Sequence, residues 1–237
     1  MSETVRISAK NLGELALPDC CPRCFWLKLK LRHRLPFQIF PGIFSSIDSY
    51  NKKVVHAWFD ELGRAPGWLA QLGDIVDYKE PPHYSKFNTL IDQFDILLTG
   101  SPDAVLVKAD GSNVIVDYKT AKYTGTQDKL FPMYEAQLNA YAYIGERCGL
   151  SPISGVALLY MEPVTDVDAK VALEHVSEQG FGLDFKANLH PVDLWPELIL
   201  PFLARCREIA DLAQPPESVV GCKNCQLLEE IATAMKF

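Results

Sequence analysis

The sequence predicts an α/β fold in which a mixed central sheet is flanked by helices. An amphipathic helical segment comes first, three short apolar segments with strand character follow, and a second helix leads into a buried strand. This order differs from the regular strand–helix alternation that builds a purely parallel sheet. A chain of 237 residues is long enough for one substantial domain.

The first helix is predicted from Ser45 to Leu62. Ser45 or Ser46 can cap its start, and Gly63 can end it. Apolar residues recur at helical spacing, so that one face can pack on a sheet; they are Ile47, Tyr50, Val54, Trp58 and Leu62.

Three strands are predicted next, at Phe94–Thr99, Ala104–Lys108 and Val114–Lys119. Each is short and apolar, and the sequence ADGS at residues 109–112 is a turn signal between the second strand and the third. These two strands should therefore pair as an antiparallel hairpin.

A second helix is predicted from Phe131 to Cys148, with Pro132 in its first turn and Gly149 just after its end. A buried strand is predicted at Gly155–Met161.

The remaining segments carry weaker signals. We expect a strand at Lys170–Val176, a helix at about 193–212, and a short terminal helix after the break at Pro215-Pro216. Pro and Gly interrupt residues 66–90, which we expect to be irregular. The periodicity of residues 24–34 fits a helix and an alternating strand equally well.

We expect one integrated domain with three parts. Residues 1–44 form an N-terminal segment with a cysteine pair and a basic stretch, residues 45–165 form the core, and residues 166–237 add strands and a helix with a second cysteine pair.

Composition limits the classes of function. The net charge of −7 argues against a protein that coats nucleic acid through a general positive surface. The stretch Arg23–Arg34 is locally basic. It is either a solvated helix face or a patch that contacts phosphate. No segment is apolar enough to span a bilayer, and no secretory signal is present, so we expect an intracellular, cytoplasmic protein without membrane contact.

The hairpin carries the residues with the clearest chemical use. Asp103 begins one strand, and Asp117 and Lys119 end its partner. Residues i and i+2 share a face of a strand, so Asp117 and Lys119 point the same way. All three lie at the end of the ribbon opposite the turn. Two carboxylates can hold Mg²⁺ or Mn²⁺, and an ammonium can position a water or stabilise a phosphate transition state. Alternatively, Asp103 caps a turn while Asp117 and Lys119 form an edge ion pair.

This stretch resembles the RecB-type branch of the PD-(D/E)XK nuclease superfamily. In that branch a G-x-x-D motif precedes an apolar strand that ends in D-x-K, matched here by Gly100 to Asp103 and by Asp117 to Lys119. A Q-x-x-x-Y motif on the next helix is matched by Gln137 and Tyr141, which are one turn apart. The resemblance spans roughly residues 45–160.

The resemblance implies a role for each matched residue. Asp103, Asp117, His56 and the carbonyl of Tyr118 would hold the metal, with Glu61 as an acidic substitute for His56 on the same helix. Lys119 would orient the water, and Gln137 and Tyr141 would bind the strand or hold the site in shape. Phe25 and Trp26 could stack on a single strand or cover a metal site.

A second D-Y-K triplet occurs at residues 77–79. It lacks the preceding G-x-x-D strand and the following Q-x-x-x-Y helix, so we expect Asp77 to be dispensable for catalysis.

Two C-x-x-C pairs lie at opposite ends of the chain, Cys21 with Cys24 and Cys222 with Cys225. They can form one four-thiolate metal site if the termini meet. The resemblance suggests a [4Fe–4S] cluster, although relatives use one cysteine upstream and three downstream. Structural Zn²⁺ and a site without metal are the alternatives. Cys20 is an additional cysteine beside these two pairs, and we expect Cys148 and Cys206 to be ordinary buried cysteines.

The resulting hypothesis is an Mg²⁺- or Mn²⁺-dependent enzyme that hydrolyses DNA, from an end or in single strands. A non-catalytic nucleic-acid-binding or assembly subunit with the same fold, and a domain acting on another substrate, are the alternatives. The chain has no G-x-x-x-x-G-K-[ST] loop, so any unwinding would come from a helicase partner.

Overall fold

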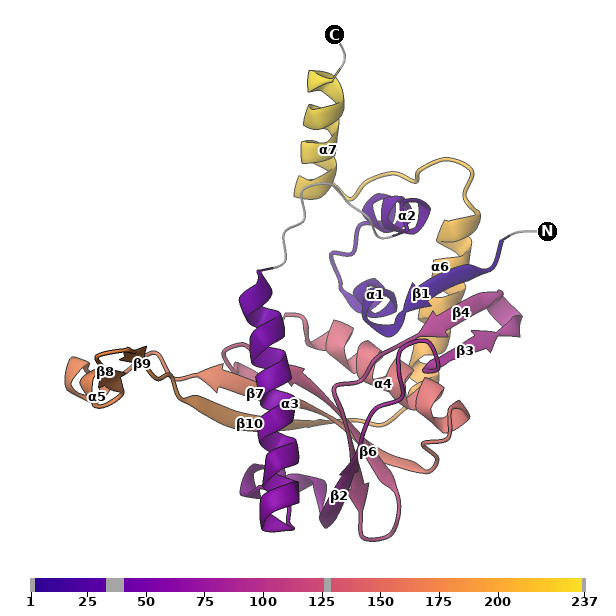
Figure 1. The fold of residues 1–237 in the computed structure, drawn as a ribbon. Coiled ribbons are helices and arrows are strands. Elements are labelled where there is room, and N and C mark those ends of the chain that lie inside the picture. The colour runs from indigo at the N-terminus through magenta and orange to yellow at the C-terminus, as the bar shows by residue number, and fades with distance from the viewer. Residues whose placement is uncertain (1–2, 33–40, 126–128, 236–237) are drawn as a thin grey trace.

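The computed structural model describes residues 3–32, 41–125 and 129–235 (Figure 1). A five-stranded mixed sheet with the order β10-β7-β6-β5-β2 lies at its centre. β6 and β7 are parallel, and the other neighbours are antiparallel. The strands are Ile75–Lys79 (β2), Ala104–Lys108 (β5), Asn113–Lys119 (β6), Ile153–Pro163 (β7) and Phe185–Val192 (β10). The predicted α/β fold with a mixed sheet is confirmed.

Helices cover both faces of this sheet, with α3 (Gly42–Leu62) on one and α4 (Phe131–Arg147) on the other (Figure 1). Side chains of β6 alternate between the two faces. Val114 and Val116 pack in the cluster that contains Phe59 of α3, whereas Ile115 packs in the cluster of Leu138. Both helices occur where the sequence predicts them, and α3 begins three residues earlier. The predicted apolar face of α3 was wrong: Asn51, Val55 and Phe59 are its buried residues, whereas Tyr50 and Leu62 are exposed.

A second, three-stranded sheet has the order β1-β4-β3, with β1 at Val5–Ser8, β3 at Asn88–Ile91 and β4 at Ile96–Thr99. The three predicted strands therefore do not form one sheet. The hairpin of β5 and β6 is present, but β4 pairs with β1 and β3 instead. Phe94 lies in the 3-10 turn η3 (Asp92–Phe94), not in the strand.

Two predictions for connecting segments were wrong. Residues 66–90 are not irregular, because they contain the 3-10 helix η2 (Gly67–Leu72), β2 and the start of β3. Lys170–Val176 is not a strand: Ala169–Glu174 forms helix α5, and Val176–Ser177 (β8) pairs only with Gly180–Phe181 (β9). This segment projects beyond the ends of β7 and β10, away from both larger sheets (Figure 1).

The terminal segments add helices around the second sheet. The ambiguous residues 24–34 belong, as far as they are described, largely to helix α2 (Pro22–Lys30). Short helices α1 (Ala9–Gly13) and η1 (Glu14–Ala16) connect β1 to it. The predicted helix at 193–212 consists of η5 (Pro196–Ile199) and α6 (Leu200–Asp211), and α7 (Lys223–Ala234) follows. Among the described helices, none is both long and apolar enough to cross a membrane.

Candidate active site and cysteine site

The register of the hairpin places Asp103 opposite Asp117. Ala104 of β5 pairs with Val116 of β6, so the preceding residue on β5 faces the following residue on β6. The carboxylate Oδ2 of Asp103 also accepts a hydrogen bond of 2.9 Å from the backbone N–H of Tyr118. The two acidic residues therefore meet at the end of the hairpin that is opposite its turn.

Asp117 is an unusual carboxylate because it is buried, with 4% of its surface exposed. Burial, together with the nearby charge of Asp103, raises the pKa of Asp117 to about 6. The ammonium of Lys119 acts in the opposite direction. A second cation at this position would favour the ionised form further.

Lys119 lies between a carboxylate and an aromatic ring. Its Nζ is 2.5 Å from Oδ2 of Asp117 and 4.2 Å from the centre of the Tyr134 ring, which belongs to α4. The ring face attracts the ammonium electrostatically and limits where it can point. Sequence reasoning did not identify Tyr134, although it lies one turn before Gln137 on the same helix.

Gln137 and Tyr141 contact the acidic pair from α4. Nε2 of Gln137 donates to Oδ1 of Asp117 at 3.2 Å and to the hydroxyl of Tyr141 at 2.8 Å. The Tyr141 ring packs on Gly100, where an added Cβ would lie only 2.8 Å from ring carbon Cδ1. The glycine of the G-x-x-D motif is therefore required for close packing between the loop before Asp103 and α4.

Helix α3 contributes residues that the sequence did not single out. Nζ of Lys52 is 2.8 Å from Oδ1 of Asp103, and the hydroxyl of Thr120 donates to Oδ1 of Asp48 at 3.3 Å. Asp48, Lys52 and His56 follow one another at intervals of four residues, so they share one face of the helix. That spacing is the signal by which Asp48 and Lys52 could have been found.

His56, one turn after Lys52, contacts residues other than the acidic pair. Its ring stacks on Tyr78 at 4.1 Å, and its Nδ1 is 3.4 Å from Oε1 of Glu80. It forms neither a hydrogen bond nor an ion pair with Asp103 in the described residues. Glu61, near the end of α3, is exposed.

The Tyr118 backbone lies at the site while its side chain points away. The side chain is buried in the cluster on the α3 side of the sheet, and burial raises its pKa.

The second D-Y-K triplet lies on β2 at the edge of the sheet. The carboxylate of Asp77 is exposed and accepts a hydrogen bond from the N–H of Tyr78 at 2.8 Å. Nζ of Lys79 donates to Oδ1 of Asn113 at 3.0 Å. Asp77 and Lys79 therefore have separate hydrogen-bond partners, whereas Asp117 and Lys119 contact each other.

The oxygen atoms around Asp117 fit a hard divalent cation. Oε1 of Gln137 is buried and has no hydrogen-bond donor in the described structure, and Oδ2 of Asp117 is buried with the Lys119 ammonium as its contact. Buried acceptors without a donor are unfavourable unless a cation or water satisfies them. Carboxylate and amide oxygens are the ligands that Mg²⁺ and Mn²⁺ prefer.

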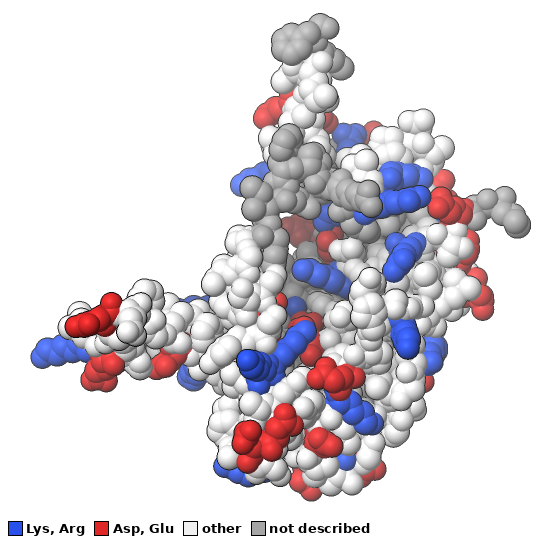
Figure 2. All heavy atoms as spheres, viewed as in Figure 1, with Lys and Arg blue, Asp and Glu red and all other residues white. Residues whose placement is uncertain are grey.

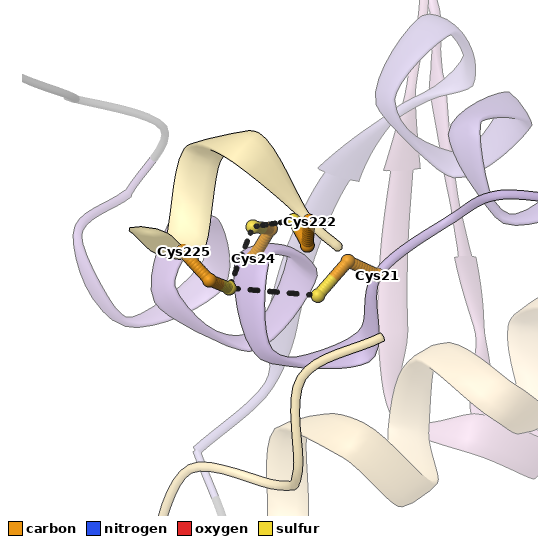
Figure 3. A group of neighbouring side chains, drawn as sticks. All are labelled: Cys21, Cys24, Cys222 and Cys225. Atoms are coloured by element: carbon orange, nitrogen blue, oxygen red, sulfur yellow. Dashed lines mark hydrogen bonds between the residues drawn. The ribbon is translucent and has the colours of Figure 1, made fainter. Parts of the chain in front are cut away.

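The two C-x-x-C pairs meet, as Figure 3 shows. Each pair lies at the start of a helix, where Cys21 precedes α2 and Cys222 precedes α7. The four sulphur atoms, all as free thiols, lie within 4.8 Å of one another. Sγ of Cys24 is 3.6 Å from that of Cys222 and 3.4 Å from that of Cys225. This group can hold a metal.

The thiols of Cys21, Cys24 and Cys225 have shifted pKa values. Burial raises the pKa of Cys225 to about 11 and also raises that of Cys24. Although burial opposes it, hydrogen bonds from the backbone of Cys24 and Val219 lower the pKa of Cys21 to about 6. Several thiolates at such short distances repel one another, so a cation is needed to hold all four ionised.

The other cysteines are separate from this group. Cys206 is buried and has a pKa raised by burial to about 12. Sγ of Cys148 donates to the carbonyl of Asn88 at 3.2 Å. Cys20 is partly buried, and burial raises its pKa to about 11.

Residues of the basic stretch contact the protein itself. Arg23 pairs with Glu229 of α7 at 3.0 Å, and Lys28 pairs with Glu14 at 2.6 Å. Nζ of Lys30 donates to a backbone carbonyl of α6 at 3.0 Å. These contacts favour the structural interpretation of the stretch; its residues 33 and 34 lie outside the described ranges.

The two aromatic residues next to the cysteines, Phe25 and Trp26, also contact the rest of the protein. Phe25 is 2% exposed and belongs to the core, so it has no free face for a base. Nε1 of Trp26 donates to the carbonyl of Leu212 at 3.0 Å.

Comparisons with known proteins identify the family of the chain. The sequence profile of the PD-(D/E)XK nuclease superfamily matches residues 26–229. No curated protein matches the chain in sequence. One similar solved structure, described as the crystal structure of SSO0001, is 11% identical with a TM-score of 0.38, covering 91% of this chain and 81% of that chain. The family match spans most of the chain, which therefore belongs to the PD-(D/E)XK nuclease superfamily.

Proposed function

We propose that this protein is an Mg²⁺- or Mn²⁺-dependent nuclease that hydrolyses DNA, from an end or in single strands. The observation that carries the proposal is the convergence of Asp103, Asp117 and Lys119 beside the buried Oε1 of Gln137, which lacks a hydrogen-bond donor in the described residues. Family membership supports nuclease activity. The Gln137–Tyr141 pair on α4, hydrogen-bonded to Asp117, supports placement in the RecB-type branch.

In this proposal each residue has a distinct task. Asp103 and Asp117 hold the metal, which when bound supplies a Lewis acid that activates water and neutralises phosphate charge. Lys119, held by Asp117 and the Tyr134 ring, orients the attacking water through its ammonium and stabilises the phosphate as charge develops. Gln137 keeps Asp117 in one orientation. Lys52 neutralises Asp103 while no metal is bound.

Catalysis is tested on labelled single-stranded and double-stranded DNA with Mg²⁺, Mn²⁺ or EDTA. Wild type is compared with Asp117→Ala and Lys119→Ala. We expect cleavage that requires metal and is lost in both variants. Absence of cleavage by a folded, metal-loaded wild type would instead favour a non-catalytic subunit, or an enzyme that works only with a helicase or another partner.

We further propose that the cysteine site holds one Zn²⁺ ion and not a [4Fe–4S] cluster. A tetrahedral ion with Zn–S bonds of about 2.3 Å separates its thiolates by about 3.8 Å. Three of the six sulphur–sulphur distances, 3.4 to 3.7 Å, are close to this spacing, and all six are within 4.8 Å. A cluster places four irons and four sulphides between the thiolates, so its cysteines must stand further apart.

Metal analysis of the purified protein separates these two possibilities. One zinc per chain, no acid-labile sulphide and no visible absorption are expected. About four irons with equal sulphide after anaerobic purification would show that the cluster is the resident group.

A further inference from the structure

A small cavity of about 230 Å³ lies directly beside the proposed catalytic site. Its walls come from β1, α1, the loop before β3 and the loop that leads to Asp103. The residues relevant to binding are Arg6, Ser8, Lys10, Tyr84, Ser101 and Tyr141. We call it the Arg6 cavity.

The Arg6 cavity shares a wall with the catalytic site. Tyr141 lines the cavity, and its hydroxyl accepts a hydrogen bond from Gln137, which also donates to Asp117. Ser101, on another wall, is two residues before Asp103 in the chain. A ligand in the cavity is therefore separated from the metal-binding carboxylates by a single layer of side chains.

The charge of the cavity favours an anion. Arg6 and Lys10 are exposed, and neither forms an ion pair or side-chain hydrogen bond within the described ranges. No Asp or Glu lines the cavity. In contrast, Arg23 and Lys28 of the basic stretch are paired with glutamates. Figure 2 shows Lys and Arg side chains spread over the viewed face near β1 and β4, although the chain has a net charge of −7.

The cavity also offers groups that suit a nucleotide. Tyr84 is 59% exposed, its ring centre lies 4.2 Å from that of His83, and every base has a face that can stack on an aromatic ring. The volume is smaller than the roughly 300–1,000 Å³ of sites that enclose a whole organic ligand. The volume of the Arg6 cavity suits one nucleotide of a single strand and is too small for a base pair.

We propose that the Arg6 cavity binds one nucleotide of a single-stranded substrate, next to the bond that is cleaved. Arg6 and Lys10 pair with its backbone phosphate, and Tyr84 stacks on its base. This proposal rests on the proposed nuclease function for its position in the reaction. It assigns the strand contacts to β1 and α1, not to the basic stretch of α2.

Binding is measured without added Mg²⁺ or Mn²⁺ and without a chelator, so that no cleavage is needed and the cysteine site keeps its metal, with a fluorescent single-stranded oligodeoxythymidylate at several salt concentrations. We expect Arg6→Ala/Lys10→Ala to weaken binding about tenfold and to lower the slope of log K against log salt by about 1.4, since each single-strand phosphate contact adds about 0.7. Tyr84→Ala should weaken binding at least about fivefold. Lys10→Glu, a change at one exposed residue, provides a second variant if the double variant is poorly folded.

The control is Lys170→Ala/Lys186→Ala, which removes the same charge from exposed positions on α5 and β10. Equal losses in the two double variants, or no loss in either, would overturn the proposal. If wild type cleaves, the Arg6 and Lys10 variants should raise KM and leave kcat unchanged. If wild type never cleaves but binds the strand through Arg6 and Lys10, the subsite stands and the nuclease proposal fails.

Discussion

Asp117→Asn should stabilise the metal-free protein while it removes activity. Asn has the shape of a protonated carboxyl, and its Oδ1 can still accept the hydrogen bond from Gln137. The pKa of Asp117 is raised from 3.8 to about 6. A difference of about 2 units, at about 1.4 kcal/mol each, means that ionised Asp117 costs the fold about 3 kcal/mol at neutral pH.

The pH dependence of this difference follows from the sign of the shift. Burial raises the folded-state pKa of Asp117, so the folded state favours the protonated carboxyl. The cost is therefore absent below about pH 4, grows as the pH rises, and is complete above about pH 6. The stability advantage of Asp117→Asn should follow the same course.

Urea unfolding in EDTA at pH 7.5 and at pH 4 measures the effect. At pH 7.5 we expect the variant to be about 3 kcal/mol more stable, or roughly 6 to 12 °C higher in Tm for a chain of this size. Addition of Mn²⁺ should stabilise wild type and leave the variant unchanged. Equal or lower stability of the variant in EDTA at pH 7.5 would refute the argument that burial of this carboxylate is costly.

Three further predictions concern other parts of the chain. Gly100→Ala should lower the free energy of unfolding by about 1–3 kcal/mol and lower kcat, because the added Cβ would displace the Tyr141 ring. The control is Gly42→Ala, whose added Cβ meets nothing within 4 Å, and both variants are compared by thermal unfolding and by cleavage assays. Asp77→Ala should retain near-wild-type cleavage, and a loss equal to that of Asp117→Ala would contradict the assignment of the site. Cys222→Ser should release the metal and lower the free energy of unfolding by roughly 5 kcal/mol, as for a cross-link closing a long loop, with zinc content and urea unfolding as the measurements.

The local features of the site could be predicted from the sequence. Asp103 and Asp117 are joined by one short hairpin, so turn position and strand alternation are enough to bring them together. Gln137 and Tyr141 are one helical turn apart, which fixes their common face. These relations depend only on secondary structure and not on how distant segments pack.

The features that were missed depend on contacts between distant segments. β2 lies in a segment interrupted by Pro and Gly and pairs with β5, and β1 pairs in parallel with β4, about 90 residues further along the chain. The rotation of α3 about its axis brings Lys52 to Asp103 and His56 to Tyr78. The periodicity of the sequence predicts the helix α3 but not which of its faces is buried, nor which of its polar residues reaches the end of the hairpin.

The N-terminal segment links the cysteine site to the Arg6 cavity. The four cysteines lie between α2 and α7, while β1 and α1 carry Arg6 and Lys10. α1 also packs so closely on α4 that a Cβ on Gly13 would lie 2.5 Å from the carbonyl oxygen of Met133. The hairpin with Asp103 and Asp117 lies in the central sheet and does not depend on this segment for its pairing. Loss of the cysteine-bound metal should therefore weaken strand binding before it disturbs the catalytic carboxylates, so KM should rise before kcat falls.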